Sequence, residues 1–166
     1  MRTIFIGLIV LVNFNVHSQT AKKFLQTGND KYDQENYRGA ISDYDRAIEI
    51  KPNYFEALML RGSAKYEQDD YKGAIADLSE AIKINPNYSA PFMTRGNAKA
   101  GLQDYRGAIS DYNRAIENKP NYSLFFMFRA KARHQLGDTD GACLDWSKAG
   151  ELGYNDAYVF IKEYCN

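Results

Sequence analysis

Few side chains in this 166-residue chain could carry out catalysis or bind a metal. There are two histidines, His17 and His134, and two cysteines, Cys143 and Cys165. These residues lack the close ligand spacing of a zinc site, and no serine or cysteine has a recognisable base and orienting acid. No glycine-rich stretch has the form of a phosphate-binding loop. We therefore predict a protein that is not an enzyme and that uses no cofactor and no metal.

The two cysteines could instead stabilise the fold. Cys143 and Cys165 are 22 residues apart. A disulfide that closes a loop of this size adds about 3 kcal/mol to stability in the chain-entropy account, and it persists in oxidising compartments. Two thiols buried as small hydrophobic groups at a helix interface are the alternative. The spacing leaves both open, because it does not show whether the Cα atoms come within reach.

The first 18 residues have the pattern of an export signal. Arg2 gives a positive start, and TIFIGLIVLVNF follows as an apolar run. Val16 and Ser18 then provide short side chains before a cut at Gln19. A membrane span needs about 20 apolar residues, so this run is too short for one. We predict that residues 1–18 are a cleaved signal peptide and that the protein is periplasmic or secreted. An uncleaved membrane anchor is the alternative.

The overall charge does not favour a nucleic-acid partner. The chain has 21 Lys and Arg against 21 Asp and Glu, so its formal net charge is +0. Binding through phosphate contacts requires a basic surface. We therefore expect no nucleic acid among its partners.

The clearest pattern is an internal repeat. YRGAISDYDRAIEIKPNY at 37–54 returns as YKGAIADLSEAIKINPNY at 71–88 and as YRGAISDYNRAIENKPNY at 105–122. Each copy starts 34 residues after the last, and the first and third differ only at Asp45/Asn113 and Ile50/Asn118. A period of this length predicts a solenoid of stacked helix pairs.

Extending the copies gives four blocks, residues 21–54, 55–88, 89–122 and 123–156. Apolar residues recur at helical spacing in each block, and a short polar turn separates two helices. A capping side chain precedes each second helix at position 16: Asn36, Asp70, Asp104 and Asp138. Residues 155–165 begin like another first helix, and we predict that they form a closing helix over the fourth pair.

The blocks resemble the tetratricopeptide repeat, which has small residues at positions 8, 20 and 27 and an aromatic residue at 24. Position 8 is Gly28, Gly62, Gly96 and Ala130. Position 24 is Tyr44, Leu78, Tyr112 and Trp146. The resemblance implies an all-α fold over residues 19–166: a right-handed α-solenoid of four helix-turn-helix units plus a C-terminal capping helix.

Charged residues replace the family's usual leucine at position 7 and tyrosine at position 11. Position 7 is Thr27, Arg61, Arg95 and Arg129. Position 11 is Lys31, Lys65, Lys99 and Arg133. Position 23 is Asp43, Asp77, Asp111 and Asp145. We predict a ladder of ion pairs along the stack. A row of arginines that grips the carboxylates of a partner is the alternative.

In this family the first helices line a concave groove, and positions 5, 9 and 12 point into it. The resemblance therefore implies a partner-binding stripe of Leu25, Asn29, Tyr32, Met59, Ser63, Tyr66, Met93, Asn97, Met127, Lys131 and His134. Flexible methionines and amphipathic tyrosines suit apolar protein partners. Gap-filling between neighbouring first helices is the alternative for the methionines.

The resemblance implies a non-enzymatic adaptor that binds a peptide or helix of another protein in this groove. A structural component of a cell-envelope assembly, using the convex face or the ends, is the alternative. A solenoid that binds a carbohydrate or other small ligand is a third hypothesis, resting on Tyr32 and Tyr66.

One subclass of the family clamps the C-terminal carboxylate of chaperones with lysine, asparagine and arginine side chains on the first helices. Of those residues only Asn29 matches here. The other clamp positions hold Leu25, Leu60, Ala90 and Thr94. We predict that this chaperone clamp is absent.

Overall fold

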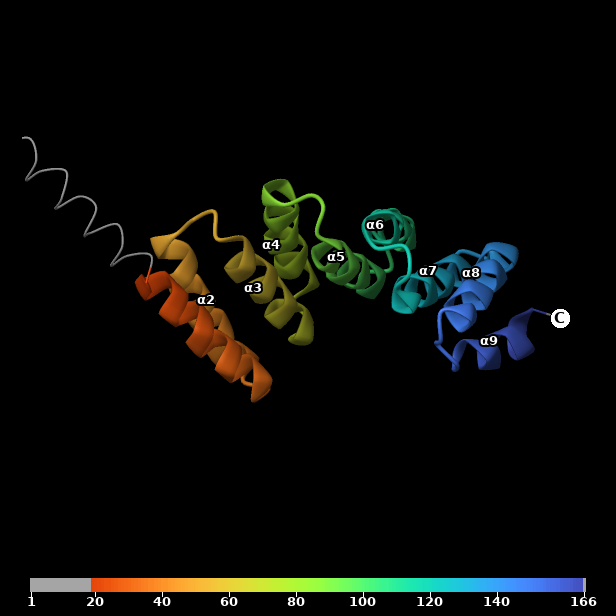
Figure 1. Ribbon diagram of the computed structural model, residues 1–166, viewed down its shortest axis with the longest axis horizontal. Coiled ribbons are helices and arrows are strands. Elements are labelled where there is room, and N and C mark those ends of the chain that lie inside the picture. Colours follow the sequence, from red (N-terminus) through yellow and green to blue (C-terminus); the bar gives the residue numbers. More distant parts are fainter. Residues whose placement is uncertain (1–18, 166) are drawn as a thin grey trace, which may run out of the picture.

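The computed structural model describes residues 19–165, so the predicted signal peptide, residues 1–18, lies outside it. A helix covers residues 19–33, and eight further helices follow: α2 (Tyr37–Ile50), α3 (Phe55–Glu67), α4 (Tyr71–Ile84), α5 (Ser89–Gly101), α6 (Tyr105–Asn118), α7 (Ser123–Gln135), α8 (Thr139–Glu151) and α9 (Ala157–Tyr164). Neighbouring helices pack in sequence along the long axis of the molecule (Figure 1). The predicted solenoid of four helix pairs plus a C-terminal helix is confirmed.

Side-chain caps start every second helix, as the sequence predicts. Asn36 Oδ1 accepts a hydrogen bond from Gly39 N at 3.1 Å, and Asp70 Oδ1 accepts one from Gly73 N at 2.9 Å. The same bond recurs at Asp104 and Asp138. Each bond satisfies a backbone N–H that has no partner within its own helix, so the start of the second helix is fixed locally.

The turn before each cap needs a left-handed residue. The φ angle at this position is 59° at Glu35, 59° at Asp69, 62° at Gln103 and 80° at Gly137. Only glycine adopts this conformation without a steric penalty from its Cβ. Three of the four turns therefore hold a residue that is unfavourable for the backbone geometry.

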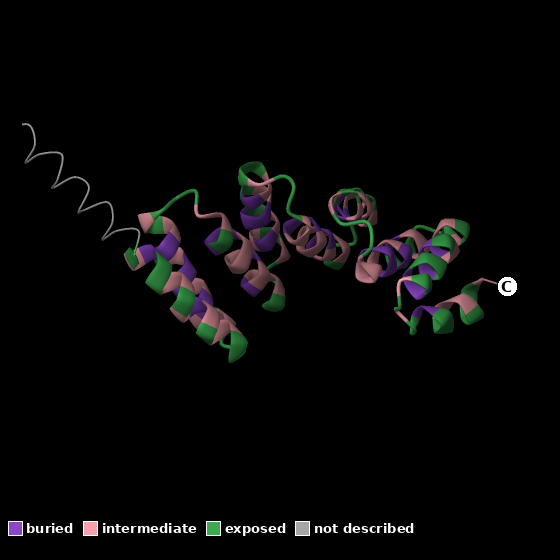
Figure 2. Ribbon diagram, in the orientation of Figure 1, coloured by how far each residue is buried: buried purple, intermediate pink, exposed green. Residues whose placement is uncertain are grey.

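Small residues let the two helices of a pair come into close contact. A Cβ added at Gly62 would lie 2.7 Å from Leu78 Cγ, and one added at Gly96 would lie 2.6 Å from Tyr112 Cε1. The alanines at positions 20 and 27 are fully buried: Ala40, Ala47, Ala74, Ala81, Ala108, Ala115, Ala142 and Ala149. Buried residues lie on the helix faces that meet neighbouring helices (Figure 2). The core is thus built by stacking, one pair on the next.

The predicted ion-pair ladder is confirmed. Asp77, which is 5% exposed, accepts hydrogen bonds from Arg61 Nε at 2.8 Å and Nη2 at 2.5 Å. Lys65 Nζ lies 2.8 Å from the same carboxylate. The arrangement recurs twice, around Asp111 with Arg95 and Lys99, and around Asp145 with Arg129 and Arg133.

Arg61, Arg95 and Arg129 also link their helix pair to the preceding pair. Arg61 Nη1 donates to Asp45 at 2.7 Å, Arg95 Nη1 donates to Ser79 at 3.0 Å, and Arg129 Nη1 donates to Asn113 at 2.6 Å. In the first pair, where Thr27 stands at position 7, Lys31 pairs with Asp43 at 2.7 Å. Because the guanidinium donors bond within the stack, the structural role is favoured over a carboxylate-binding role.

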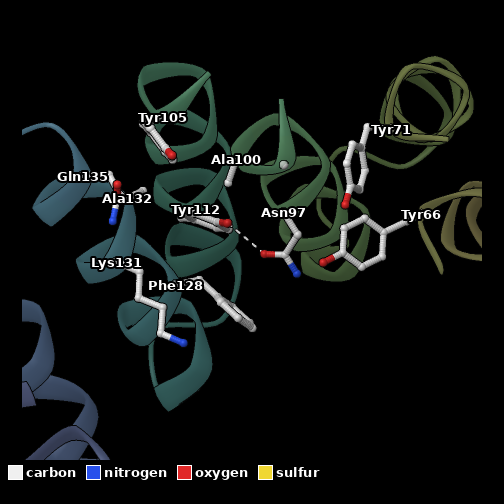
Figure 3. A pocket seen from close by; sticks show the side chains of 11 residues that line it. Tyr66, Tyr71, Asn97, Ala100, Tyr105, Tyr112, Phe128, Lys131, Ala132 and Gln135 are labelled. Atoms are coloured by element: carbon white, nitrogen blue, oxygen red, sulfur yellow. Dashed lines mark hydrogen bonds between the residues drawn. The ribbon is translucent and has the colours of Figure 1, made fainter. Parts of the chain in front are cut away.

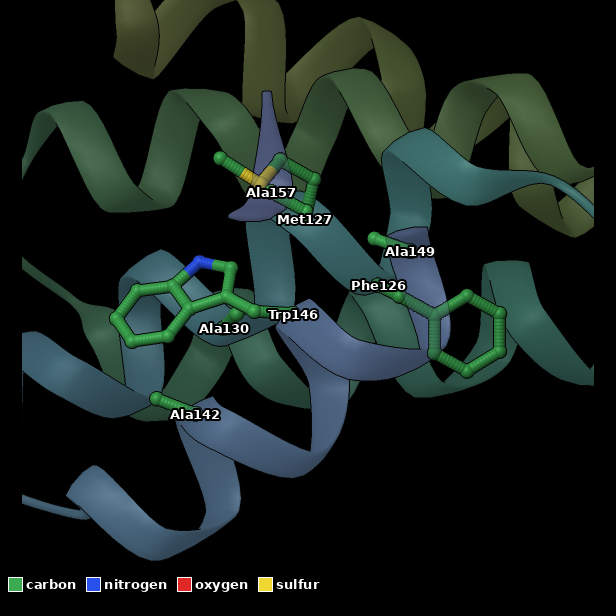
Figure 4. Packing of buried hydrophobic residues seen from close by; sticks show 7 residues of the cluster. All are labelled: Phe126, Met127, Ala130, Ala142, Trp146, Ala149 and Ala157. Carbon is green, nitrogen blue, oxygen red and sulfur yellow. The ribbon is translucent and has the colours of Figure 1, made fainter. Parts of the chain in front are cut away.

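The C-terminal end is closed by α9, which begins at Ala157, two residues later than predicted. Phe160 and Tyr164 stack on Trp146, with ring centroids 5.5 Å and 5.7 Å apart. The cluster buried between α7, α8 and α9 contains Phe126, Met127, Ala130, Ala142, Trp146, Ala149 and Ala157 (Figure 4). A disulfide joins Cys143 of α8 to Cys165, directly after α9, with the Cα atoms 5.7 Å apart.

Candidate protein-binding groove

A cavity of about 250 Å³, here called the central cavity, lies among α3, α5 and α7 and the starts of α4 and α6 (Figure 3). Its lining residues are Tyr66, Tyr71, Asn97, Ala100, Gly101, Tyr105, Tyr112, Phe128, Lys131, Ala132 and Gln135. Five of these eleven residues are aromatic. The Asn97 amide and the Lys131 ammonium group are polar groups that can fix the orientation of a bound chain.

Asn97 is held in place by a tyrosine of its own repeat. Tyr112 Oη donates a hydrogen bond to Asn97 Oδ1 at 2.8 Å, and Tyr44 Oη donates to Asn29 Oδ1 at 2.9 Å. The Asn97 amide nitrogen points away from Tyr112 (Figure 3), so it can donate to a ligand in the cavity. In the second repeat, leucine replaces the tyrosine and Ser63 replaces the asparagine. The amide is therefore present where a tyrosine is present to orient it.

A second cavity of about 270 Å³, here called the N-terminal cavity, has a related lining. Its residues are Asn29, Tyr32, Asp33, Tyr44 and Leu60. They occupy positions 9, 12, 13 and 24 of the first repeat and position 6 of the second. The third and fourth repeats use the same positions to line the central cavity. The two cavities are thus copies of one arrangement, two repeats apart.

Burial raises the pKa of four of the tyrosines that line the two cavities. The pKa of Tyr32 is raised to about 12, first by burial and then by the carboxylate of Glu67. Burial is also the main cause that raises the pKa of Tyr44, Tyr66 and Tyr112. Near neutral pH these phenols therefore act as hydrogen-bond donors and carry no charge.

The structure distributes the predicted groove residues among different environments. Five of them line the two cavities: Asn29, Tyr32, Tyr66, Asn97 and Lys131. Met93 lines a third cavity, of about 270 Å³, with Tyr88, Tyr122 and Phe125.

Leu25, Met59 and Ser63 mainly serve packing. Leu25 and Met59 are partly buried against the clusters between helix pairs. Ser63 Oγ donates to the backbone carbonyl of Met59 at 3.1 Å. Gap-filling therefore describes Leu25 and Met59 better than exposure along a binding stripe.

The prediction for Met127 needs correction, and His134 lies in a different environment from the residues that line the cavities. Met127 is 1% exposed, so the expectation that it contacts a partner in this conformation is wrong. The His134 ring lies against Tyr164 and Trp146, with centroids 4.5 Å and 5.7 Å away. The physical reason is α9, which covers the side of the fourth pair that corresponds to the open cavities of earlier pairs.

The sequence analysis does not assign several lining side chains to the groove, among them Leu60, Tyr71, Tyr105 and Phe128. Helical spacing carried a signal for two of them, because position 6 lies one turn before position 9 on the same face. Tyr71 and Tyr105 stand at position 17, the first residue of the repeated sequence. From the sequence alone, a packing role at this position cannot be distinguished from a role in lining a cavity.

Over residues 19–165, no group of three or more His, Cys, Asp or Glu side chains is arranged to hold a metal ion. None of the helices in this range is long and apolar enough to cross a membrane.

Known structures resemble this chain over most of its length. The crystal structure of MamA has a TM-score of 0.78 and 24% identity, and the match covers 84% of this chain and 81% of that chain. The first TPR of Spaghetti (RPAP3) bound to HSP90 peptide SRMEEVD has a TM-score of 0.71 and 28% identity, covering 72% of this chain and 95% of that one. The first TPR domain of the human RPAP3 protein has a TM-score of 0.70 and 26% identity, covering 72% and 94%.

A comparison with curated protein sequences finds no match. The family model for the tetratricopeptide repeat matches residues 25–89 and 93–150, which together make up most of the chain. The helix-pair architecture and the fold comparisons agree with that match. The chain therefore belongs to the tetratricopeptide repeat family, whose domains typically mediate protein–protein interaction.

Proposed function

We propose that this protein is an exported, non-catalytic adaptor that binds a peptide or helix of a partner protein along its first helices. The observation that carries the proposal is the central cavity, where aromatic walls surround an oriented amide donor. A partner backbone carbonyl could accept from Asn97 Nδ2, while an apolar partner side chain packs between Tyr66 and Phe128.

The size of the cavity favours one side chain of a longer partner over a separate small ligand. Its volume of about 250 Å³ falls below the roughly 300–1,000 Å³ of typical small-molecule pockets. The repetition of the arrangement in the N-terminal cavity fits a ligand that is long enough to reach both. A peptide or helix meets this requirement, and a single sugar does not.

The chaperone peptide named for the RPAP3 structure is not part of this proposal. Of the clamp residues only Asn29 is present, and its oxygen already accepts the Tyr44 hydroxyl beside Leu60. A carboxylate would find no cluster of cations at this place.

Export forms the second part of the proposal. It is supported by the pattern of residues 1–18 and by the Cys143–Cys165 disulfide, a bond that persists in oxidising compartments. N-terminal sequencing of the protein from its native host tests this part. We expect a mature chain that begins at Gln19, and a chain that retains Met1 in the cytosolic fraction would contradict export.

The alternative, a structural part of an assembly, is favoured by apolar side chains at the C-terminal end. Leu144 of α8 is 72% exposed and Val159 of α9 is 62% exposed. These side chains lie apart from both cavities. The two hypotheses therefore place the partner on different surfaces.

Site-specific photo-crosslinking separates them. Benzoylphenylalanine replaces Tyr66 in the central cavity, Leu144 at the C-terminal end, or Ile84 as a control exposed on α4, and each variant is irradiated in intact cells. We expect a crosslinked partner from the Tyr66 site and none from the Ile84 site. Crosslinks from the Ile84 or Leu144 positions without any from Tyr66 would reject groove binding and support the structural role.

A further inference from the structure

The groove face of the fourth repeat is covered by a helix that the chain attaches through a disulfide. Lys131 and His134 stand at positions 9 and 12 of that repeat. Their counterparts in the third repeat, Asn97 and Ala100, line the open central cavity. In the fourth repeat Lys131 still lines the central cavity, but α9 packs against His134: the Tyr164 ring contacts the imidazole, and the Phe160 ring lies 5.6 Å from Lys131 Nζ.

Little of α9 is fully buried. The helix has eight residues, and Ala157 is its one buried residue. Tyr158 and Val159 are 55% and 62% exposed. A helix this short is not stable without its neighbours, so its position depends on the stacked rings and on the bond from Cys165 to Cys143.

The covered site contains polar atoms that have no partner while α9 is in place. His134 Nδ1 and Trp146 Nε1 are buried and make no hydrogen bond. Such groups cost free energy when they are removed from water, which opposes the covered state. Both would gain a partner from water or from a bound peptide if α9 moved away.

The disulfide that closes the cover is open to a reductant. Both cysteines line a hollow of about 680 Å³ between α8 and α9, together with Leu144, Ser147, Ile161 and Tyr164. Leu144 and Ser147 are exposed and form part of its wall, so a reducing protein could approach the sulfurs from the α8 surface.

We propose that α9 is a redox-controlled cover over a fourth-repeat extension of the groove, formed by Trp146 and His134 next to Lys131. This inference rests on the proposed groove function and adds its regulation. With the disulfide intact the cover is closed, and reduction releases it. The opened site then offers a flat aromatic surface, the Trp146 Nε1–H donor and His134 Nδ1 to a longer peptide.

The chemical step is thiol–disulfide exchange with a dithiol, such as that of a thiol–disulfide oxidoreductase. One thiolate of the dithiol attacks a sulfur of the Cys143–Cys165 bond, which forms a mixed disulfide and releases the other cysteine. The second thiol of the dithiol displaces the remaining cysteine. Two electrons and two protons pass to the protein, and the dithiol leaves as its own disulfide.

Trp146 is the only tryptophan of the chain, so its fluorescence reports the cover without a label. Acrylamide quenching and amide hydrogen exchange are compared for the oxidised protein, the protein reduced with dithiothreitol, and the Cys143→Ser/Cys165→Ser variant. Loss of the cross-link frees only the segment after α8, so we expect exchange in α9 to become about 10- to 100-fold faster, with stronger quenching of Trp146.

Exchange in α2–α6 and the far-ultraviolet circular dichroism provide the internal control, because a local opening leaves both nearly unchanged. Equal quenching and equal α9 exchange in all three samples would overturn the proposal. So would an acceleration that is uniform over all helices, since the bond would then act on global stability alone.

A crosslinking arm separates this proposal from the groove function. Benzoylphenylalanine in place of His134 should capture the partner only after reduction, whereas the same group in place of Tyr66 should capture it in both states. No capture from Tyr66 would reject groove binding. The opening of α9 would then be judged by Trp146 quenching and hydrogen exchange alone. Capture from the 134 position in the oxidised protein would reject the cover.

Discussion

At the residue scale, buried carboxylates organise each helix pair. Asp77 holds Arg61 and Lys65 together, although like charges repel each other. The carboxylate is nearly fully buried, and both cations are partly shielded from water. Removing the shared carboxylate from such a buried site therefore costs much more stability than removing one partner of an exposed ion pair.

Replacing the shared carboxylate should be costly. We expect Asp77→Ala to lower the free energy of unfolding by about 3 kcal/mol, because two partly buried cations are left without their anion. Glu80→Ala on the same helix is the matched control, since the Glu80–Lys83 pair is solvent-exposed and contributes little. Urea denaturation of both variants measures the difference, and equal losses would refute the structural role of the ladder.

The Tyr112 hydroxyl should matter for both stability and the cavity. Tyr112→Phe removes the donor to Asn97 Oδ1 and should cost about 1 kcal/mol of unfolding free energy. Tyr105→Phe is the control, because Tyr105 lines the same cavity without a hydrogen bond to Asn97. Denaturation curves that superimpose for the two variants would show that the Tyr112–Asn97 bond does not stabilise the fold.

Alkaline pH should weaken the fold through the cavity tyrosines. The pKa of Tyr32 rises from 10.0 to about 12 on folding, so between these values the unfolded chain loses a proton that the folded chain keeps. The unfolded state then binds fewer protons, and the free energy of unfolding falls as pH increases. We expect stability that is steady below pH 10 and declines towards pH 12, measured by thermal unfolding. The Tyr32→Phe variant should show a shallower decline, and an identical pH profile would contradict the assignment.

At the element scale, the tight turn inside each helix pair combines a favourable cap with an unfavourable backbone angle. Asp104 caps α6 locally, while Gln103 directly before it has a φ of 62°. The fourth repeat has Gly137 at the equivalent place. Gly137 suits this left-handed angle and Gln103 does not, so the two turns can be compared within one protein.

Exchanging these residues should move stability in opposite directions. Gln103→Gly should raise the free energy of unfolding by about 0.5–1 kcal/mol, because relief of the left-handed strain exceeds the added freedom of the unfolded chain. Gly137→Ala should lower it by about 1 kcal/mol, since open space surrounds that position and only the φ angle of 80° opposes a Cβ. Changes of the same sign in the two variants would count against this explanation.

At the scale of the whole molecule, the solenoid has two unequal ends. The first pair has Thr27 where later pairs have an arginine, and Lys31 pairs with its buried aspartate. The last pair is covered by α9 and cross-linked by the Cys143–Cys165 disulfide. Because each pair contacts only its neighbours, stability is expected to vary along the stack.

Unfolding of the oxidised protein should therefore begin at the N-terminal end. We expect amide hydrogens in residues 19–33 and α2 to exchange faster than those in α5–α8. Hydrogen exchange followed by mass spectrometry provides the measurement. Protection that is lowest in α7 and α8 would show that the arginine links and the disulfide do not set the order.

The sequence by itself determined the features that depend on local spacing. The 34-residue period predicted the helix pairs, the residues before each second helix predicted the caps, and the recurring charges predicted the ladder. These predictions succeed because backbone capping and helix periodicity involve residues that are close along the chain. Because the repeat has a fixed length, the same local contacts recur in each helix pair.

Only the tertiary structure decided which first-helix positions remain open. Asn97 and His134 both stand on the predicted groove face, yet the first lines a cavity and the second lies beneath α9. The same distinction buries Met127 and brings Cys143 within bonding distance of Cys165. The physical reason is that exposure depends on the helix that packs next in the stack, and equivalent positions in a repeat differ as soon as that neighbour differs.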